Sequence, residues 1–101
     1  MTSFKIEFHY DISADFSEAY IWYEQRANGL GEKFLSAVRA KIEQIAQSPD
    51  TYGEKHKKGY RECKVDIFPY LVVYKVYKKK KVVFVSSIHH ERKHSSSKYR
   101  K

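Results

Sequence analysis

Cysteine is nearly absent from this 101-residue chain, and its scarcity limits the kinds of protein to which the chain can belong. Cys63 stands alone, so no intramolecular disulfide can form and a reducing compartment is favoured. The longest apolar block, Phe68 to Tyr74, is far too short to cross a bilayer. The first residues, MTSFKIEFHYDIS, contain no apolar run typical of a signal peptide. We therefore expect a cytoplasmic protein that has no membrane partner.

Negative charge is scarce in the second half of the chain. Residues 55–101 contain fifteen Lys or Arg against three Asp or Glu, a net charge of +12, whereas residues 1–54 contain five against nine, a net of −4. A positive field concentrated on one half of a protein attracts polyanions. We favour an anionic partner over the alternative, a basic surface that only keeps the protein soluble.

The composition is that of a globular protein, with 42% hydrophobic and 32% charged residues. A chain of this length forms one domain with a single modest core. Aromatic residues are frequent at 16%, so both the core and the surface contain large rings.

The first half of the chain predicts a strand followed by two helices. Apolar residues alternate with polar ones, which is typical of a strand with one buried face formed by Phe4, Ile6, Phe8 and Tyr10. Ser13 is a suitable N-cap and Asp15 suits the first turn of a helix from about Ala14 to Ala27. After the Asn28-Gly29 turn, a second helix extends from about Leu30 to Gln47, where Ser48-Pro49 ends it. Two helices joined by a short turn form a hairpin.

The second half predicts a polar loop over residues 49–59 and then three strands. Their expected bounds are about Tyr60–Ile67, Tyr70–Tyr77 and Lys81–His89. The last two are apolar on both faces, which is typical of central strands, and Lys78–Lys80 forms the polar tip of the hairpin between them. We predict an α+β fold of order β-α-α-β-β-β, with the helical hairpin packed on one face of a mainly antiparallel four-stranded sheet.

Several motifs in this order resemble the RelE/ParE superfamily of type II toxins, and its ParE-type branch in particular. They are the run YIWYEQRANGLGEKFLSAVRAKIEQIAQSP, a Gly-Tyr-Arg strand, Phe68-Pro69-Tyr70, Val73-Tyr74, and an apolar strand that ends in His-x-x-Arg. The resemblance implies one toxin domain over residues 1–94, followed by a basic tail at 95–101. The tail has no apolar periodicity, and we expect it to be mobile unless it is docked.

The resemblance implies a small cytoplasmic toxin that a cognate antitoxin neutralises, and it leaves two targets open. ParE-like members poison DNA gyrase, whereas RelE-like members cleave mRNA in the ribosome. We expect a gyrase inhibitor, with the ribosome-dependent endoribonuclease as the alternative and a non-toxic nucleic-acid or protein-binding module as a third hypothesis. The antitoxin should be acidic or carry an amphipathic segment, and it should wrap the helical hairpin, the sheet edge or both, covering the basic cluster.

RNA cleavage by a 2′-hydroxyl needs a base, an acid and cations that stabilise the phosphorane. Arg61 begins one strand and the group His89, His90 and Arg92 ends another, so antiparallel strand geometry can bring them to a common edge. In RelE-like nucleases such residues do this work, which implies that Arg61 and Arg92 hold phosphate, that His90 or His89 acts as acid or base, and that Tyr99 contributes from the tail. The alternative is that Arg61 and Arg92 form structural ion pairs or bind antitoxin acids.

Further basic and polar residues are candidates for contact with nucleic acid or with the target. They are Arg61, Lys64, Lys93, Tyr99 and Arg100. Lys64 should lie on the solvent-exposed face of its strand, because it alternates with the apolar residues Cys63 and Val65.

His90-Glu91-Arg92-Lys93-His94 matches the zinc-protease pattern H-E-x-x-H, which requires both His residues on one helical face. Here the motif follows a strand, and no acidic residue lies downstream of Glu91 to supply a third ligand. We therefore expect no metal site and no cofactor, so that any enzymatic activity is that of a metal-independent endoribonuclease.

Four other features favour structural roles over functional ones. Cys63 is expected in the core rather than as a reactive thiol, and the Gly29-Leu30-Gly31 sequence as a helix-connecting turn rather than a phosphate loop. Tyr20, Trp22 and Tyr23 are expected to pack rather than to stack on bases. Residues 78–81 are expected to be a solvated hairpin tip, although lysines there are also suited to contact a nucleic-acid backbone.

Overall fold

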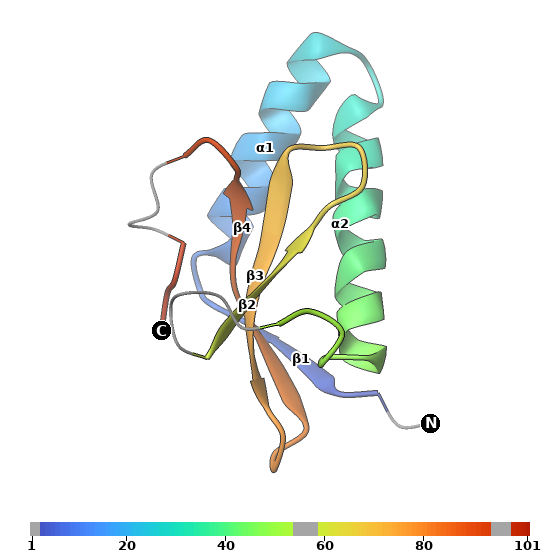
Figure 1. Cartoon of the computed structure of the whole chain (residues 1–101). Helices are drawn as coiled ribbons and strands as arrows, with labels where there is room; N and C mark the ends of the chain where they lie inside the picture. The colour runs from blue at the N-terminus through green and yellow to red at the C-terminus, as the bar shows by residue number, and fades with distance from the viewer. Residues whose placement is uncertain (1–2, 54–58, 94–97) are drawn as a thin grey trace.

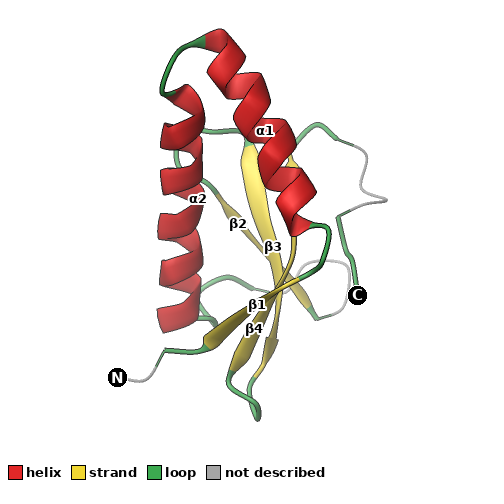
Figure 2. Cartoon of the chain, turned by 180° about the vertical axis from the view of Figure 1, so that it is seen from behind, coloured by secondary structure: helices red, strands yellow, loops and turns green. Residues whose placement is uncertain are grey.

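The structure is a computed structural model that describes residues 3–53, 59–93 and 98–101. Its elements follow the predicted order: β1 (Lys5–Phe8), α1 (Ile12–Arg26), α2 (Leu30–Gln47), β2 (Tyr60–Lys64), β3 (Tyr70–Tyr77) and β4 (Val82–His90). The two helices form a hairpin that covers one face of the sheet (Figures 1 and 2). The predicted two-layer α+β architecture is therefore confirmed. None of the described helices is long and apolar enough to span a bilayer.

The sheet has the strand order β1-β4-β3-β2, so β3 and β4 occupy its centre as their apolar sequences predict. The β2–β3 and β3–β4 pairs are antiparallel. The β1–β4 pair is parallel, with Lys5 opposite Val82 and Phe8 opposite Val85. Because β2 and β4 both run antiparallel to β3, these two strands point in the same direction.

The core lies between the helices and the facing side of the sheet, which we call the helix face. Phe34 and Val38 of α2 and Val72 and Tyr74 of β3 are fully buried there. Phe68 of the β2–β3 loop packs edge to face on Tyr23 of α1 and on Phe34 of α2, with ring centroids 4.9 and 5.3 Å apart. Cys63 is also fully buried and free, which agrees with the prediction of a core cysteine.

The start of α1 differs from the prediction. The helix begins at Ile12, and Asp11 rather than Ser13 occupies the N-cap position, without a side-chain capping bond. Asp15 does lie in the first turn as expected. The predicted buried face of the first strand is wrong beyond Ile6, because Phe8 is 50% exposed and Tyr10, in the turn that leads into α1, is 85% exposed.

The predicted strand Tyr60–Ile67 is too long, since β2 ends at Lys64. The chain turns there because the Val65 amide donates to the Tyr70 carbonyl at 2.9 Å. Ile67 is therefore 92% exposed and takes a left-handed φ of 75° instead of joining the core face. In β4, Ser86 is an extra residue between the pairs Val73–Ser87 and Tyr74–Val85, so the residues beyond it change register.

Candidate functional site

The end of β4 places its two histidines on opposite faces of the sheet. His90 lies opposite Tyr70 and points to the helix face, whereas His89 lies opposite Leu71 on the other face. The His90 ring packs edge to face on Tyr70 with centroids 5.0 Å apart, and its Nδ1 accepts a hydrogen bond from the Arg92 amide at 3.1 Å. These contacts orient the His90 ring without occupying both of its nitrogens.

His90 and Arg92 border an open groove between α1 and the ends of β3 and β4. The groove has a volume of about 700 Å³, and its lining is largely apolar, formed by Trp22, Tyr23, Pro69 and Tyr70 with Lys93 and Glu18 at the rim. Trp22 is 49% exposed, and the Arg26 guanidinium lies 4.0 Å from its ring centroid. The prediction of a packed aromatic stripe thus holds for buried Tyr23, whereas Trp22 is half-exposed and lines this groove.

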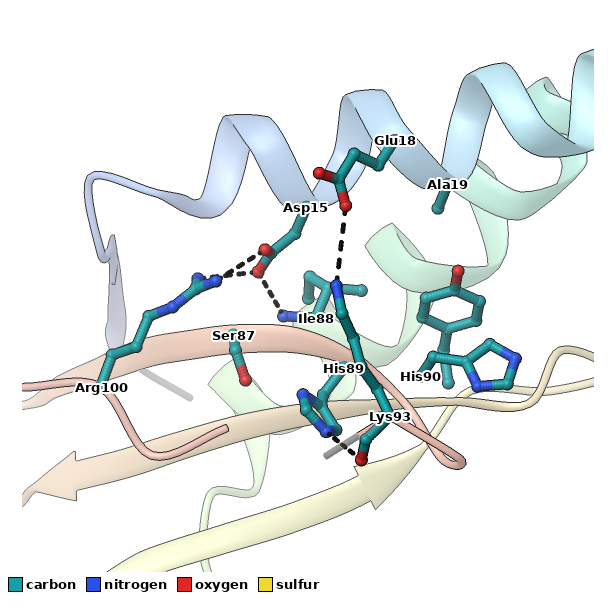
Figure 3. A pocket seen from close by; sticks show the side chains of 10 residues that line it. Asp15, Glu18, Ala19, Ser87, Ile88, His89, His90, Lys93 and Arg100 are labelled. Carbon is teal, nitrogen blue, oxygen red and sulfur yellow. Dashed lines mark hydrogen bonds and ion pairs between the residues drawn. The ribbon is translucent and has the colours of Figure 1, made fainter. Parts of the chain in front are cut away.

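His89 lies at a smaller cavity of about 40 Å³ between α1 and β4 (Figure 3). The side chain is buried, and its Nε2 is 3.2 Å from the Lys93 carbonyl oxygen. Burial lowers the pKa of His89 below its usual value, and the nearby charges of Lys98 and Lys93 act in the same direction. His89 is therefore neutral at pH 7, with one ring nitrogen bound within the protein.

Arg61 lies far from the β4 histidines. It pairs with Tyr74 in β3, whereas His89 is opposite Leu71, so the two positions are about 10 Å apart along the strands and two strand spacings apart across the sheet. Its guanidinium donates to the Tyr52 carbonyl and forms an ion pair with Asp50 at 3.4 Å. The expectation of a common edge is wrong, because β2 and β4 run parallel and Arg61 is near the start of β2.

Lys64 is the basic residue of β2 that does reach the end of the sheet where β4 finishes. Its exposed side chain lies on the face opposite the helices, as predicted, in a cross-strand row with Leu71 and His89. The Nζ donates to the Phe68 carbonyl at 3.2 Å and lies 3.9 Å from a Glu91 carboxylate oxygen.

Residues 98–100 contact both β4, through the hydroxyls of Ser86 and Ser87, and β2, through Tyr60 and Glu62. Arg100 forms a two-pronged ion pair with Asp15 of α1, at 2.8 and 2.9 Å, and its amide donates to the Ser86 hydroxyl at 2.6 Å. The Tyr99 hydroxyl donates to Glu62. Burial, assisted by this hydrogen bond and the Glu62 charge, raises the pKa of Tyr99 to about 12. Tyr99 and Arg100, predicted as target-binding residues, thus make internal contacts here.

Figure 3 shows how α1 and β4 are joined around this cavity. The Asp15 carboxylate also accepts a hydrogen bond from the Ile88 amide at 3.0 Å, so one acidic side chain binds both β4 and Arg100. Lys93 reaches Glu18 at 3.7 Å, with both side chains largely exposed. The role of Asp15 was missed from the sequence, where it was visible only as a favourable first-turn residue.

Within the described ranges, no three His, Cys, Asp or Glu side chains are grouped so that they could hold a metal ion. His90 of the H-E-x-x-H pattern lies at the end of a strand rather than on a helix. His94 lies outside the described residues. The zinc geometry that the pattern requires is thus absent from the part of the motif that the structure describes.

Comparison with known proteins was made by sequence and by structure. The family model of the ParE toxin of the type II toxin–antitoxin system parDE matches residues 6–94. A chain of the chromosomal ParDE system of P. aeruginosa is similar in fold, with a TM-score of 0.76 at 14% identity over 87% of this chain and 96% of that one.

The isolated E. coli RelE toxin is similar with a TM-score of 0.64 at 17% identity, over 91% of this chain and 88% of that one. A double-arginine mutant of RelE in the free state gives 0.56 at 18% identity, over 89% and 85%. No curated protein sequence shows significant similarity to the chain. The family match covers most of the chain, and the chain therefore belongs to the ParE toxin family of type II toxin–antitoxin systems.

Proposed function

We propose that this protein inhibits growth in the cytoplasm by binding DNA gyrase, and that a cognate antitoxin neutralises it. The observation that carries the proposal is the dispersal of the candidate catalytic residues. His89 and His90 alternate along β4 and both reach the cavity of about 40 Å³, but His89 is buried with its Nε2 3.2 Å from the Lys93 carbonyl oxygen. Arg61 lies near the other end of β2, in contact with Asp50. Acid–base catalysis requires groups within hydrogen-bond reach of one reacting centre, so this arrangement favours a binding function over RNA cleavage.

The groove between α1 and the ends of β3 and β4 is the surface we assign to the target. Half-exposed Trp22 supplies a rigid aromatic anchor, and Arg92 and Lys93 supply positive charge at the rim. Aromatic and arginine side chains at the centre of a contact typically dominate the binding energy of protein interfaces. An acidic segment of the target with an apolar side chain would complement both features.

Gyrase supercoiling assays with the purified protein test the proposal. We expect inhibition by the wild-type protein and at least a tenfold weaker effect of Trp22→Ala, which removes the aromatic anchor. Ile21→Ala is the matched control, because Ile21 is 55% exposed on the same helix but lies outside the groove. Unimpaired supercoiling in the presence of wild-type protein would refute gyrase as the target.

The apolar groove beside β1 suits the antitoxin. It has a volume of about 460 Å³ and is lined by Ile6 and Phe8 of β1, Phe16 of α1, and Leu35 and Ile42 of α2. β1 is an edge strand, so an amphipathic segment can pack there and also pair with the strand. Phe8→Glu should weaken antitoxin binding in calorimetry while leaving gyrase inhibition intact, and an unchanged affinity would exclude this surface.

Ribosome-dependent mRNA cleavage is a second candidate, favoured by the grouping of His90, Arg92 and Lys93 at one end of the sheet. In that case His90 acts as acid or base and Arg92 holds phosphate. Arg92→Ala should then abolish cleavage of ribosome-bound mRNA while the protein stays folded. Intact cleavage by this variant would remove Arg92 from the mechanism, and growth that is unaffected by induced expression would favour a non-toxic binding module.

A further inference from the structure

The hairpin between β3 and β4 ends in a run of four lysines that projects from the sheet. Residues 78–81 are all exposed and form the lowest point of the molecule in both views (Figures 1 and 2). The pairing of β3 with β2 reaches no further toward the tip than Lys75, and the pairing of β4 with β1 begins at Val82. No described strand therefore flanks the tip, and its side chains are accessible from several directions.

Positive charge is concentrated at this end of the sheet, in residues that come from two elements and the turn between β3 and β4. The lysines concerned are Lys5, Lys75, Lys78, Lys79, Lys80 and Lys81. Among the described residues, Asp50 is the acid that forms an ion pair with this group, at 3.1 Å from Lys78. One paired lysine among six leaves a strong local field, which attracts a polyanion.

An exposed aromatic ring lies within this field. Tyr77 is 41% exposed, and its ring centroid is 5.7 Å from the Lys75 ammonium and 5.9 Å from that of Lys80. A ring between two cations offers an apolar surface to a sugar or base and a hydroxyl to a phosphate, while the ammonium groups bind neighbouring phosphates. The hairpin thus combines the two kinds of contact that a nucleic acid requires.

We propose that residues 75–81, which we call the lysine arm, bind the phosphate backbone of duplex DNA. The major groove of B-form DNA is about 12 Å wide and admits a two-stranded β-ribbon, whereas that of A-form RNA is too narrow for side chains to enter. The arm forms the tip of the β3–β4 hairpin, which is a two-stranded ribbon of this kind. This inference goes beyond the proposed function, and it holds or fails without reference to gyrase or to the ribosome.

The salt dependence of DNA binding tests the arm. Each lysine–phosphate contact contributes about −0.9 to the slope of log K against log salt concentration for duplex DNA. Lys79→Ala with Lys80→Ala should therefore make the slope shallower by about 1.8, so that raising salt from 50 to 200 mM costs about 12-fold less affinity than in the wild type. Fluorescence anisotropy of a labelled duplex, measured on the full chain, gives both slopes.

Lys33→Ala with Arg39→Ala is the matched control, because it removes the same charge from exposed positions of α2 away from the arm. We expect this control to keep the wild-type slope. An equal change in the control would show that net charge alone drives binding, and undetectable binding of wild-type protein at 50 mM salt would also overturn the proposal.

Duplex RNA of the same sequence provides the second comparison. Equal or tighter binding to that RNA would overturn the assignment to DNA, whereas weaker binding supports it. The lysine tip is exposed, so both double variants should melt at the wild-type temperature. Lys79→Gln alone, expected to change the slope by about 0.9, tests the same contact if the double variant is unstable.

Discussion

We expect the contact of Asp15 with Arg100 to contribute more to the stability of the fold than any other single polar interaction that the structure describes. Asp15 accepts three hydrogen bonds, two from the Arg100 guanidinium and one from the Ile88 amide. Its side chain is 12% exposed and that of Arg100 is 19% exposed. The hydrogen bond to Asp15 is the main reason why the pKa of Arg100 is raised. Asp15→Ala would leave the Ile88 amide without its acceptor and the largely buried guanidinium with the Ser86 carbonyl at 3.3 Å as its remaining acceptor among the described residues.

The expected cost follows from what remains after the substitution. Removing one member of a buried ion pair costs about 3–5 kcal/mol, and partial exposure of both groups reduces this to about 3 kcal/mol. For a domain of this size the melting temperature should fall by roughly 12–24 °C. Arg100→Ala should cost about 2 kcal/mol, because the Ile88 bond to Asp15 survives, and the double variant about 3.5 kcal/mol.

Urea denaturation of the wild type, the two single variants and the double variant measures the coupling free energy between Asp15 and Arg100, which we expect to be about 1.5 kcal/mol. Glu18→Ala is the control on the same helix, since the Glu18–Lys93 pair is 73% and 58% exposed and should contribute less than about 0.5 kcal/mol. Additive costs of Asp15→Ala and Arg100→Ala would refute the contact, as would a loss for Asp15→Ala no larger than that for Glu18→Ala.

Three further substitutions test other parts of the structure. Burial lowers the pKa of His89 in the folded protein, so below about pH 6.5 protons bind the unfolded chain preferentially. Wild-type stability should therefore fall as the pH decreases through this range. His89→Gln should lose this pH-dependent component in thermal melts from about pH 7.5 to about pH 5, and an unchanged profile would contradict the prediction. Gly31→Ala would place a methyl group 2.8 Å from Cγ of Glu24 and 2.8 and 2.9 Å from ring atoms of Tyr20, so we expect about 1–3 kcal/mol of destabilisation in denaturant titrations. A neutral effect would show that both side chains move freely. Ile67→Asn should stabilise the protein by about 1 kcal/mol, because Asn tolerates the φ of 75° better than a β-branched residue and little apolar contact is lost. A lower melting temperature of the variant would show that the exposed Ile67 side chain packs more than the structure indicates.

The fold could be predicted largely from periodicity, because both central strands and α2 carry long apolar patterns. The errors arose where local signals compete. Cys63, Val65 and Ile67 alternate as in a strand, but the bond between Val65 and Tyr70 turns the chain and places Ile67 in solvent. Ser13 resembles an N-cap, yet the turn at Asp11 begins the helix earlier. Both deviations come from local turns, whose backbone hydrogen bonds the apolar pattern does not reveal.

The site was less predictable, because it depends on strand order and direction. His90 and Arg92 could be identified as neighbours from their spacing alone. The separation of Arg61 from them depends on β2 and β4 running parallel on either side of β3, which sequence patterns do not reveal. Asp15 and Arg100 are 85 positions apart, so nothing local pointed to their contact.

The pairing of β1 with β4 has a consequence for how the protein is made. β1 is synthesised first, but its hydrogen-bonding partner is the last strand, and both helices and two strands are translated between them. Such non-local pairing slows folding relative to the local helical hairpin. A nascent chain therefore holds an unpaired first strand until β4 has left the ribosome. The groove residues His90 and Arg92 also come from the end of β4, so a prematurely terminated chain lacks both the completed sheet and the surface assigned to the target.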